Sequence, residues 1–205
     1  MKIRFRLSRQ RPDSFAIRLF YLKMDKIIKL LIVIGFIIMF LRKAEAKPPE
    51  YENCKELSTL YNDAKIFTAR ISKYMDIVDK ESKENDIDPI LTMAIIWQES
   101  SGFPNAMRWE GAEIGYSYGL MGLTLPAARD MGFEGKGIDL LQPDINIKYG
   151  VKYLRWQIQR YKGDVEKGIS AYNAGHYTEK NRGYVNSVLE KKKAIWQALH
   201  CQKNK

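Results

Sequence analysis

The most constraining feature of the sequence is a short apolar stretch that leaves no polar face. Within residues 90–97 only Thr92 is polar, so a helix of these residues is apolar on nearly every side and must be surrounded by protein. Asp88 is a typical N-cap, Pro89 suits the first helical position, and Gly102 is the expected C-cap. The chain is therefore predicted to fold around one buried helix.

The other long segments carry apolar residues on one face only. Apolar residues recur at spacings of three and four, the period of an amphipathic helix, in residues 52–84, 143–161, 164–175 and 185–199. The first of these is long enough for one or two helices. Residues 102–123 are rich in Gly, Ser and Tyr and are expected to hold a small β-hairpin or a binding loop. We therefore predict a mainly α, single compact helical domain with minimal β structure.

The charge of the chain is unevenly distributed. The formal net charge is +10, which alone would suggest a polyanionic partner. Residues 1–46 hold 11 Lys and Arg against 3 Asp and Glu, out of 34 and 24 in the whole chain. Residues 47–205 therefore hold 23 basic and 21 acidic residues. A body so close to neutral argues against nucleic-acid binding.

The first 46 residues are typical of an export leader. Residues 30–41 form an apolar run of 12 residues, preceded by lysines and followed by Ala44-Glu45-Ala46. A basic stretch, a short apolar core and an A-x-A site indicate a signal peptide, and membrane spanning needs about 20 residues. We expect cleavage near Ala46 and export to the periplasm. The alternative is an uncleaved anchor to the inner membrane, because Arg42 and Lys43 follow the core. Met24 is a second possible start.

Two cysteines, Cys54 and Cys201, lie at opposite ends of the exported part. Because export leads to an oxidising compartment, a disulfide between them is predicted; the alternative is two unpaired thiols. The sequence contains no C-x-x-C, and His176 and His200 are isolated, so no metal site and no cofactor are expected.

Glu99 is the candidate catalytic residue, because it stands in the last turn of the apolar helix. Burial and the negative end of the helix dipole both disfavour its anion and raise its pKa. A carboxyl group that stays protonated near neutral pH can act as a general acid. The alternative is a surface glutamate that forms a salt bridge at a frayed helix end.

Several separated motifs carry a resemblance over roughly residues 85–195. They are Ile95-Ile96-Trp97-Gln98-Glu99-Ser100, Tyr118-Gly119-Leu120-Met121, Pro143-Asp144-Ile145-Asn146-Ile147, Ala171-Tyr172-Asn173-Ala174-Gly175 and Tyr184-Val185. Taken in this order, they resemble the motifs of the lytic transglycosylases of the goose-lysozyme-like superfamily. The resemblance implies a lysozyme-like fold. It divides the chain into a leader (1–46), an N-terminal helical segment (47–84) and a catalytic domain (85–201).

The resemblance also implies an activity on peptidoglycan glycan strands. Such enzymes cleave the MurNAc–GlcNAc β-1,4 bond and leave 1,6-anhydro-muramoyl ends, with one glutamate, here Glu99, as acid and then base. Residues in the matching motifs are expected to bind the substrate: Ser100, Tyr118, Met121, Tyr172, Asn173 and Tyr184. For Tyr118, Met121 and Tyr172 a plain core position is the alternative, and for Asn173 a bond to backbone at the helix end.

The chain departs from the family pattern in three ways. Gly122 stands where the family usually has Gln, Glu99 and Gly119 are 20 residues apart, and the loop serine of many large members has no clear match. In size and loop length the chain is more similar to small members linked to secretion, conjugation or pilus systems, so such an apparatus is an expected partner. We expect a monomer.

Two other functions stay open. A muramidase on the same fold would use Glu110 or Glu113 to help water attack, although both are more simply explained as solvated loop charges. A non-catalytic peptidoglycan-binding protein could have kept the fold.

Overall fold

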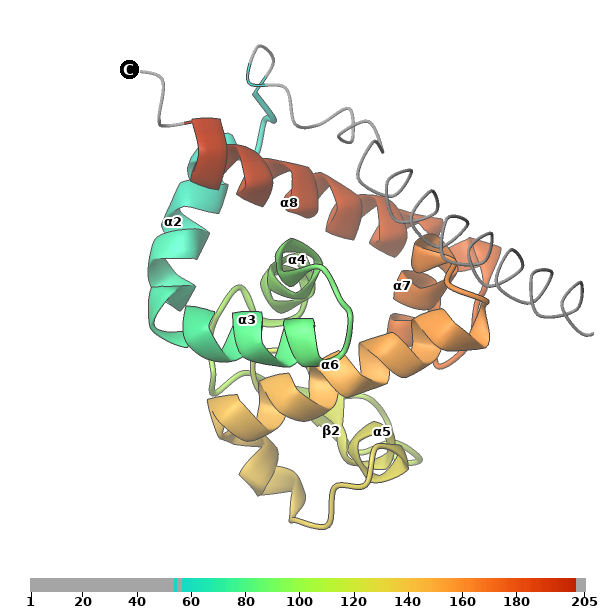
Figure 1. Ribbon diagram of the computed structural model, residues 1–205. Coiled ribbons are helices and arrows are strands. Elements are labelled where there is room, and N and C mark those ends of the chain that lie inside the picture. The colour runs from blue at the N-terminus through green and yellow to red at the C-terminus, as the bar shows by residue number, and fades with distance from the viewer. Residues whose placement is uncertain (1–53, 55–56, 202–205) are drawn as a thin grey trace, which may run out of the picture. The chain divides into compact units, whose positions relative to one another are not determined.

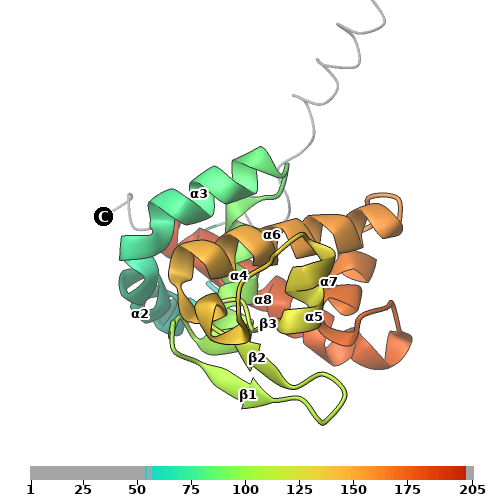
Figure 2. The same cartoon turned by 90° about the horizontal axis from the view of Figure 1, so that it is seen from below.

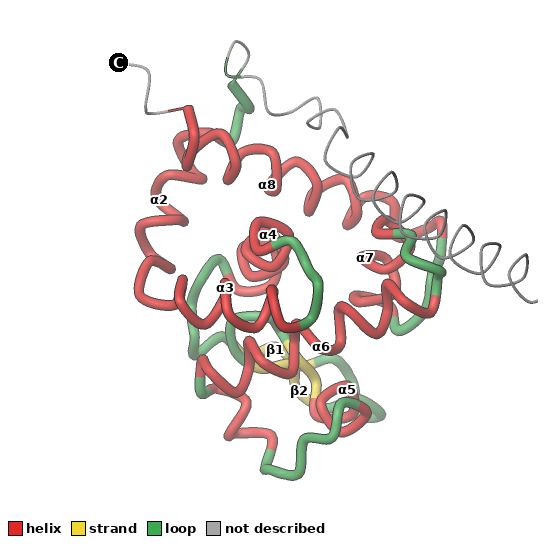
Figure 3. Tube along the Cα trace, in the orientation of Figure 1, coloured by secondary structure: helices red, strands yellow, loops and turns green. Residues whose placement is uncertain are grey.

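The computed structural model describes Cys54 and residues 57–201. The leader expected at residues 1–46, and with it the alternative of a membrane anchor, lies outside the described residues. Helices dominate, and Figure 1 shows them arranged as a ring around a central one. The ring is formed by α2 (Tyr61–Ile71), α3 (Met75–Glu84), α6 (Pro143–Arg160), α7 (Val165–Ala174) and α8 (Arg182–His200). The tube in Figure 3 shows the few strands gathered on one side of this ring.

The central helix is α4 (Pro89–Ser100), the apolar stretch from which the fold was predicted. Six consecutive residues, from Leu91 to Ile96, are buried, which confirms that protein surrounds the helix. Asp88 caps its start by accepting a hydrogen bond from the Ile90 amide at 2.9 Å.

The other end of α4 differs from the prediction. The C-cap is Ser101, which adopts a left-handed conformation with φ 52°, and not Gly102. Gly102 follows with φ +81°, and a Cβ there would meet the Ile71 side chain at 2.7 Å. The glycine therefore lets α2 pack closely against the end of α4, and this contact between distant segments could not be predicted from spacing.

The segment expected to hold a hairpin forms a three-stranded antiparallel sheet, which confirms the β structure. Its strands are β1 (Met107–Trp109), β2 (Tyr116–Tyr118) and β3 (Leu123–Thr124), in the order β1-β2-β3. Arg108 pairs with Ser117 across the first two strands, so the two side chains point to the same face. The hairpin projects below the helices in Figure 2.

A short helix and three 3₁₀ turns complete the described chain. Helix α5 (Leu125–Asp130) begins at Thr124, whose side chain accepts from the Ala127 amide. The turns are η2 (Ser72–Tyr74), η3 (Gly137–Leu141) and η4 (Glu179–Asn181). Because η2 separates α2 from α3, the segment predicted as one or two helices is two. The predicted later helices are confirmed as α6, α7 and α8, the last of which begins three residues earlier than expected.

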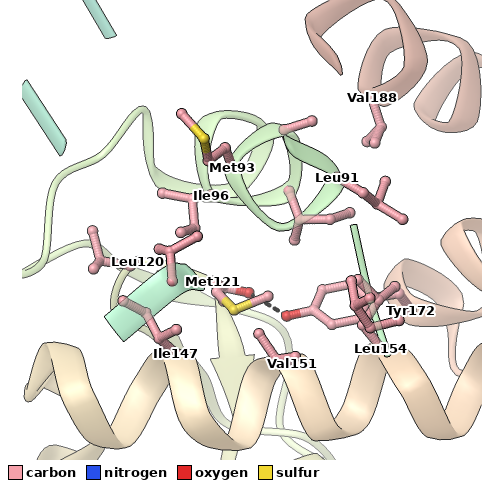
Figure 4. Packing of buried hydrophobic residues seen from close by; sticks show 14 of the residues in the cluster. Leu91, Met93, Ile96, Leu120, Met121, Ile147, Val151, Leu154, Tyr172 and Val188 are labelled. Carbon is pink, nitrogen blue, oxygen red and sulfur yellow. Dashed lines mark hydrogen bonds between the residues drawn. The ribbon is translucent and has the colours of Figure 1, made fainter. Parts of the chain in front are cut away.

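The core surrounds α4, and the helices of the ring and the segment that links β2 to β3 all contribute buried apolar residues to it. Figure 4 shows Met121 of that segment packed among side chains of α4 and α6, with the Tyr172 ring beside it. The ends of the domain are joined by the predicted disulfide between Cys54 and Cys201. None of the described helices is both long and apolar enough to cross a membrane.

Candidate active site

Glu99 lies in the last turn of α4, at the edge of the core and next to strand β1. Its side chain is 6% exposed, so it is not the surface glutamate of the alternative interpretation. It lines a cavity of about 410 Å³. The other walls come from β1 and its following loop, the β3–α5 region, α6 and the end of α7: Arg108, Glu110, Ile114, Gly122, Leu123, Thr124, Pro126, Ala127, Asp130, Tyr153, Tyr172, Asn173, Ala174 and Gly175.

Two polar groups contact the Glu99 carboxyl from different elements. The Tyr184 hydroxyl of α8 donates a hydrogen bond to Oε1. The Arg108 guanidinium of β1 lies on the other side, with Nη2 3.9 Å from Oε2. Each oxygen of the carboxyl group therefore has its own polar neighbour, and the hydrogen bond from Tyr184 orients the group.

The environment of Glu99 raises its pKa above the ordinary value. Burial is the largest cause, because it disfavours the anion. The Tyr184 hydrogen bond and the Arg108 charge lower the pKa, the charge of Glu110 raises it, and the net shift is upward. The predicted effect of burial is thus confirmed. A raised pKa favours the protonated form of the carboxyl group, which is the form that can donate a proton.

Ser100 holds the end of α4 in place. Its hydroxyl is buried and lies 2.7 Å from the Leu120 carbonyl and 3.0 Å from that of Ile96, and it accepts from the Gly102 amide. These bonds tie the residue next to Glu99 to the segment before β3. Contact between Ser100 and a substrate stays a prediction.

Asn146 supports the same segment and was missed as a site residue by the sequence analysis. It is fully buried in α6. Its amide donates to the carbonyls of Tyr118 and Leu140, at 2.7 and 2.8 Å, and accepts from the Met121 amide at 2.7 Å. A lone asparagine among the apolar positions of a helix was the available signal, because a buried amide needs partners.

Met121 and Tyr172 pack against each other behind Glu99. Met121 is fully buried, so the structure places it in the core, the alternative to a groove wall. The Tyr172 hydroxyl donates to the Met121 carbonyl at 2.7 Å, the dashed line in Figure 4. Tyr172 is 7% exposed and still lines the cavity. It is therefore a core residue that also forms part of the cavity wall.

The remaining predicted residues differ in their access to the cavity. Asn173 is exposed at the end of α7 and lines the cavity, whereas Tyr118 is half-buried and is not among its lining residues. Tyr184 reaches Glu99 directly. A role in substrate binding stays a prediction for all three.

Gly122, the main departure from the family pattern, lies directly against Glu99. It has φ +57°, and a Cβ there would be 2.7 Å from Oε2 of Glu99 and 3.1 Å from its Cβ. The glycine therefore makes room for the carboxyl group. A glutamine at this position could not adopt the same conformation without displacing Glu99.

The two loop carboxylates have different surroundings. Glu110 lines the cavity, and its Oε1 accepts from Arg108 Nε and from Ser117 Oγ, both at 2.7 Å. Burial acts to raise its pKa, but the hydrogen bonds from Ser117 and Arg108 and the Arg108 charge outweigh burial and lower it. Glu113 is exposed and does not line the cavity. Among the described residues, no cluster of three or more His, Cys, Asp and Glu could hold a metal ion.

Comparison with known families agrees with this geometry. The model of the Transglycosylase SLT domain matches residues 76–195, more than half of the chain. The chain belongs to this family. The predicted resemblance is thereby confirmed. The match begins inside the segment 47–84, so the boundary at residue 85 stays a prediction.

Curated relatives include longer bacterial and phage proteins. The membrane-bound lytic murein transglycosylase F of Vibrio cholerae is 31% identical over 126 residues, which are 57% of this chain and 22% of that protein. The transglycosylase of Enterobacteria phage PRD1 is 28% identical over 122 residues, or 58% of this chain and 42% of the relative. The chain thus spans about a fifth of the bacterial relative and less than half of the phage one.

Solved structures confirm the lysozyme-like fold. An inactive mutant of the lytic transglycosylase Slt from Pseudomonas aeruginosa has a TM-score of 0.51 at 24% identity and covers 60% of this chain and 23% of its own. The 70 kDa soluble lytic transglycosylase of Escherichia coli has a TM-score of 0.51 at 23% identity, and the match covers 62% of this chain and 24% of the E. coli protein.

Proposed function

We propose that the protein is a peptidoglycan lytic transglycosylase, with Glu99 as its single acid and base. The observation that carries this proposal is a buried, protonatable carboxyl group that lines an open cavity and is oriented by a tyrosine hydroxyl. Membership of the SLT family supports the substrate class. The bond cleaved would be the MurNAc–GlcNAc β-1,4 linkage.

The chemistry needs one proton to be delivered and later taken back. Protonated Glu99 gives its proton to the glycosidic oxygen as that oxygen leaves the anomeric carbon. The acetamido group of the same sugar assists at this carbon, in place of a second protein carboxylate. The Glu99 carboxylate then takes the proton of the sugar's 6-hydroxyl group, and the oxygen of that hydroxyl group bonds to the anomeric carbon. The product is a 1,6-anhydro-muramoyl end, and Glu99 is protonated again.

Asn173 and Tyr172 are the residues that we propose for substrate contact next to Glu99. Asn173 is exposed on the cavity wall, where its amide can bond an acetamido group. The ring of Tyr172 lines the cavity while its hydroxyl is occupied by the Met121 carbonyl. Tyr172 would therefore offer an apolar surface to a sugar and no free donor.

We also propose that the enzyme works in the periplasm on local remodelling of the cell wall. The leader features support export, and the disulfide between Cys54 and Cys201 suits an oxidising compartment. Service to a secretion, conjugation or pilus apparatus rests on the chain's size and loop length alone. A transglycosylase of Enterobacteria phage PRD1 is also among the relatives.

A muramidase is the second candidate, because Glu110 places another carboxylate on the wall of the same cavity. Its lowered pKa keeps it ionised, as a base that activates water must be. Its oxygen, however, already accepts bonds from Arg108 and Ser117. The third candidate is a non-catalytic binder. The departure from the family pattern at Gly122 does not favour it, because the glycine leaves room for the Glu99 carboxyl group.

Digestion of purified peptidoglycan followed by mass spectrometry tests the proposal. A lytic transglycosylase releases fragments with anhydro ends, which are lighter than reducing ends by one water and resist borohydride. Reducing ends would support the muramidase. If nothing is released at any pH at which the protein is folded, the non-catalytic candidate stands.

A further inference from the structure

The cavity wall includes a cation, Arg108, next to the acid Glu99. A reaction that needs only one carboxyl group does not by itself require this cation. We propose that Arg108 is a positioning residue, whose guanidinium engages the Glu99 carboxylate between its two proton transfers and so lets one residue act first as acid and then as base. This inference rests on the proposed function and adds a second residue to it.

Arg108 is anchored at one end and looser at the other. Its Nε donates to Glu110 Oε1 at 2.7 Å, and the same oxygen accepts from Ser117 Oγ at 2.7 Å. Its Nη2 stands 3.9 Å from Glu99 Oε2. The register of the hairpin produces this arrangement, since Arg108 and Ser117 are direct cross-strand partners. The guanidinium thus lies between two carboxyl groups. The hydrogen bond to Glu110 holds it in place, and Glu99 is the more distant of the two.

The longer contact suits a partner whose charge changes during the reaction. Protonated Glu99 is neutral and gains little from a nearby cation. Once its proton has gone to the leaving sugar, Glu99 is a buried carboxylate with little water around it, and this burial destabilises the anion. A positive charge close by compensates for part of that cost. The Arg108 side chain is 62% exposed, so it can close this gap without repacking the core.

The other groups that face Glu99 do not supply a positive charge. Tyr184 of α8 donates a hydrogen bond, and the pKa of its hydroxyl is raised well above the ordinary value, chiefly by burial. Tyr172 of α7 is neutral, with a pKa raised by burial. Glu110 is negative and raises the Glu99 pKa. Among the described residues, Arg108 is the cation that acts on Glu99.

The test compares Arg108→Gln with Arg108→Lys and with a matched control. Gln removes the charge, whereas Lys keeps it but loses the two-sided geometry of the guanidinium. Arg155→Gln is the control: it removes the same charge and breaks an ion pair, with Asp86 at 3.2 Å, on a part of α6 outside the cavity. Turnover of peptidoglycan is measured against pH for all three variants and the wild type.

We expect Arg108→Gln to lower kcat about tenfold or more with little change in KM, because the interaction is made during the reaction and not in the ground state. Its activity should also persist to higher pH than that of the wild type, because loss of the cation raises the pKa of the acid. Arg108→Lys should lie between the two, and Arg155→Gln should match the wild type.

An Arg108→Gln enzyme with the kcat and the pH profile of the wild type would overturn the inference. A rise in KM alone would overturn it too, because Arg108 would then bind substrate and not act through Glu99. The same change in Arg155→Gln would show a general charge effect and would also contradict it.

An NMR titration of the Glu99 carboxyl carbon in ¹³C-glutamate protein separates this inference from the proposed function. The Glu99 signal is the one that disappears in Glu99→Gln. Its pKa should be higher in Arg108→Gln, or in Arg108→Met if the first variant does not fold, whether or not the wild type cleaves glycan. An unchanged pKa refutes the role of Arg108, whereas inactivity of the wild type refutes only the proposed function.

Discussion

Replacement of Gly122 should damage the site through geometry alone. In Gly122→Ala the new residue must adopt φ +57°, and a left-handed conformation costs a non-glycine residue about 1–2 kcal/mol. Its Cβ would also lie 2.7 Å from Oε2 of Glu99, closer than such atoms approach, and overpacking of this kind costs about 1–3 kcal/mol. The total loss of stability is therefore about 2–5 kcal/mol, part of which is relieved if the carboxyl group moves.

Gly132→Ala is the matched control, since Gly132 has φ +84° and no atom within 4 Å of an added Cβ. Both variants carry the backbone cost, and only Gly122→Ala displaces the acid. Thermal unfolding should show a larger loss in Gly122→Ala, and its turnover should fall about 10²-fold, the effect of moving a catalytic group by about 1 Å. Gly122→Gln, which restores the usual family residue, should be at least as inactive. A Gly122→Ala enzyme as active and as stable as Gly132→Ala would refute the reasoning.

The remaining predictions concern the ends of the domain and the second carboxylates. Cys54→Ser with Cys201→Ser opens a loop of 147 residues, worth about 5 kcal/mol in the chain-entropy model, so calorimetry should show a Tm lower by about 10–20 °C; an unchanged Tm would contradict this. Glu110→Gln should keep most of the activity, since the Gln oxygen can still accept from Arg108, and Glu113→Gln should keep it because Glu113 is exposed outside the cavity; a loss of 10²-fold or more in either would favour the muramidase. N-terminal sequencing of protein from the cell envelope should find a start near Ala46, and an intact leader would indicate an anchored enzyme.

The central helix and its acid could be predicted because their signals are local. A run of apolar residues with its own cap determines burial wherever it lies, and a glutamate at its end shares that burial. The disulfide between Cys54 and Cys201 is a long-range contact that was predicted on other grounds, namely export to an oxidising compartment and the presence of only these two cysteines.

The other contacts between distant segments could not be predicted from local signals. Arg108 reaches Glu99 only because of the register of a three-residue strand, and nothing in the local sequence fixes that register. Asn146 supports the segment before β3 from a helix more than twenty residues away. Gly102, which follows the C-cap at Ser101, packs against Ile71 of α2. Each depends on the tertiary fold.

Glu99→Gln should preserve the fold while it removes the transferable proton. The folded state raises the pKa of Glu99, so the stability that the protonated form provides is lost as the pH rises from the ordinary pKa through the raised one. The neutral amide does not ionise. At a pH above this range, the unfolding temperature of the variant should therefore be equal to that of the wild type or higher.

The most direct test of the account is the turnover of peptidoglycan by folded Glu99→Gln, measured as anhydro-ended fragments beside the wild type. General acid–base catalysis contributes about 10²–10⁴-fold, and with a single acid and base we expect a loss at least that large. A Glu99→Gln enzyme that releases these fragments at a rate near that of the wild type would contradict the assignment of Glu99 and, with it, the proposed mechanism.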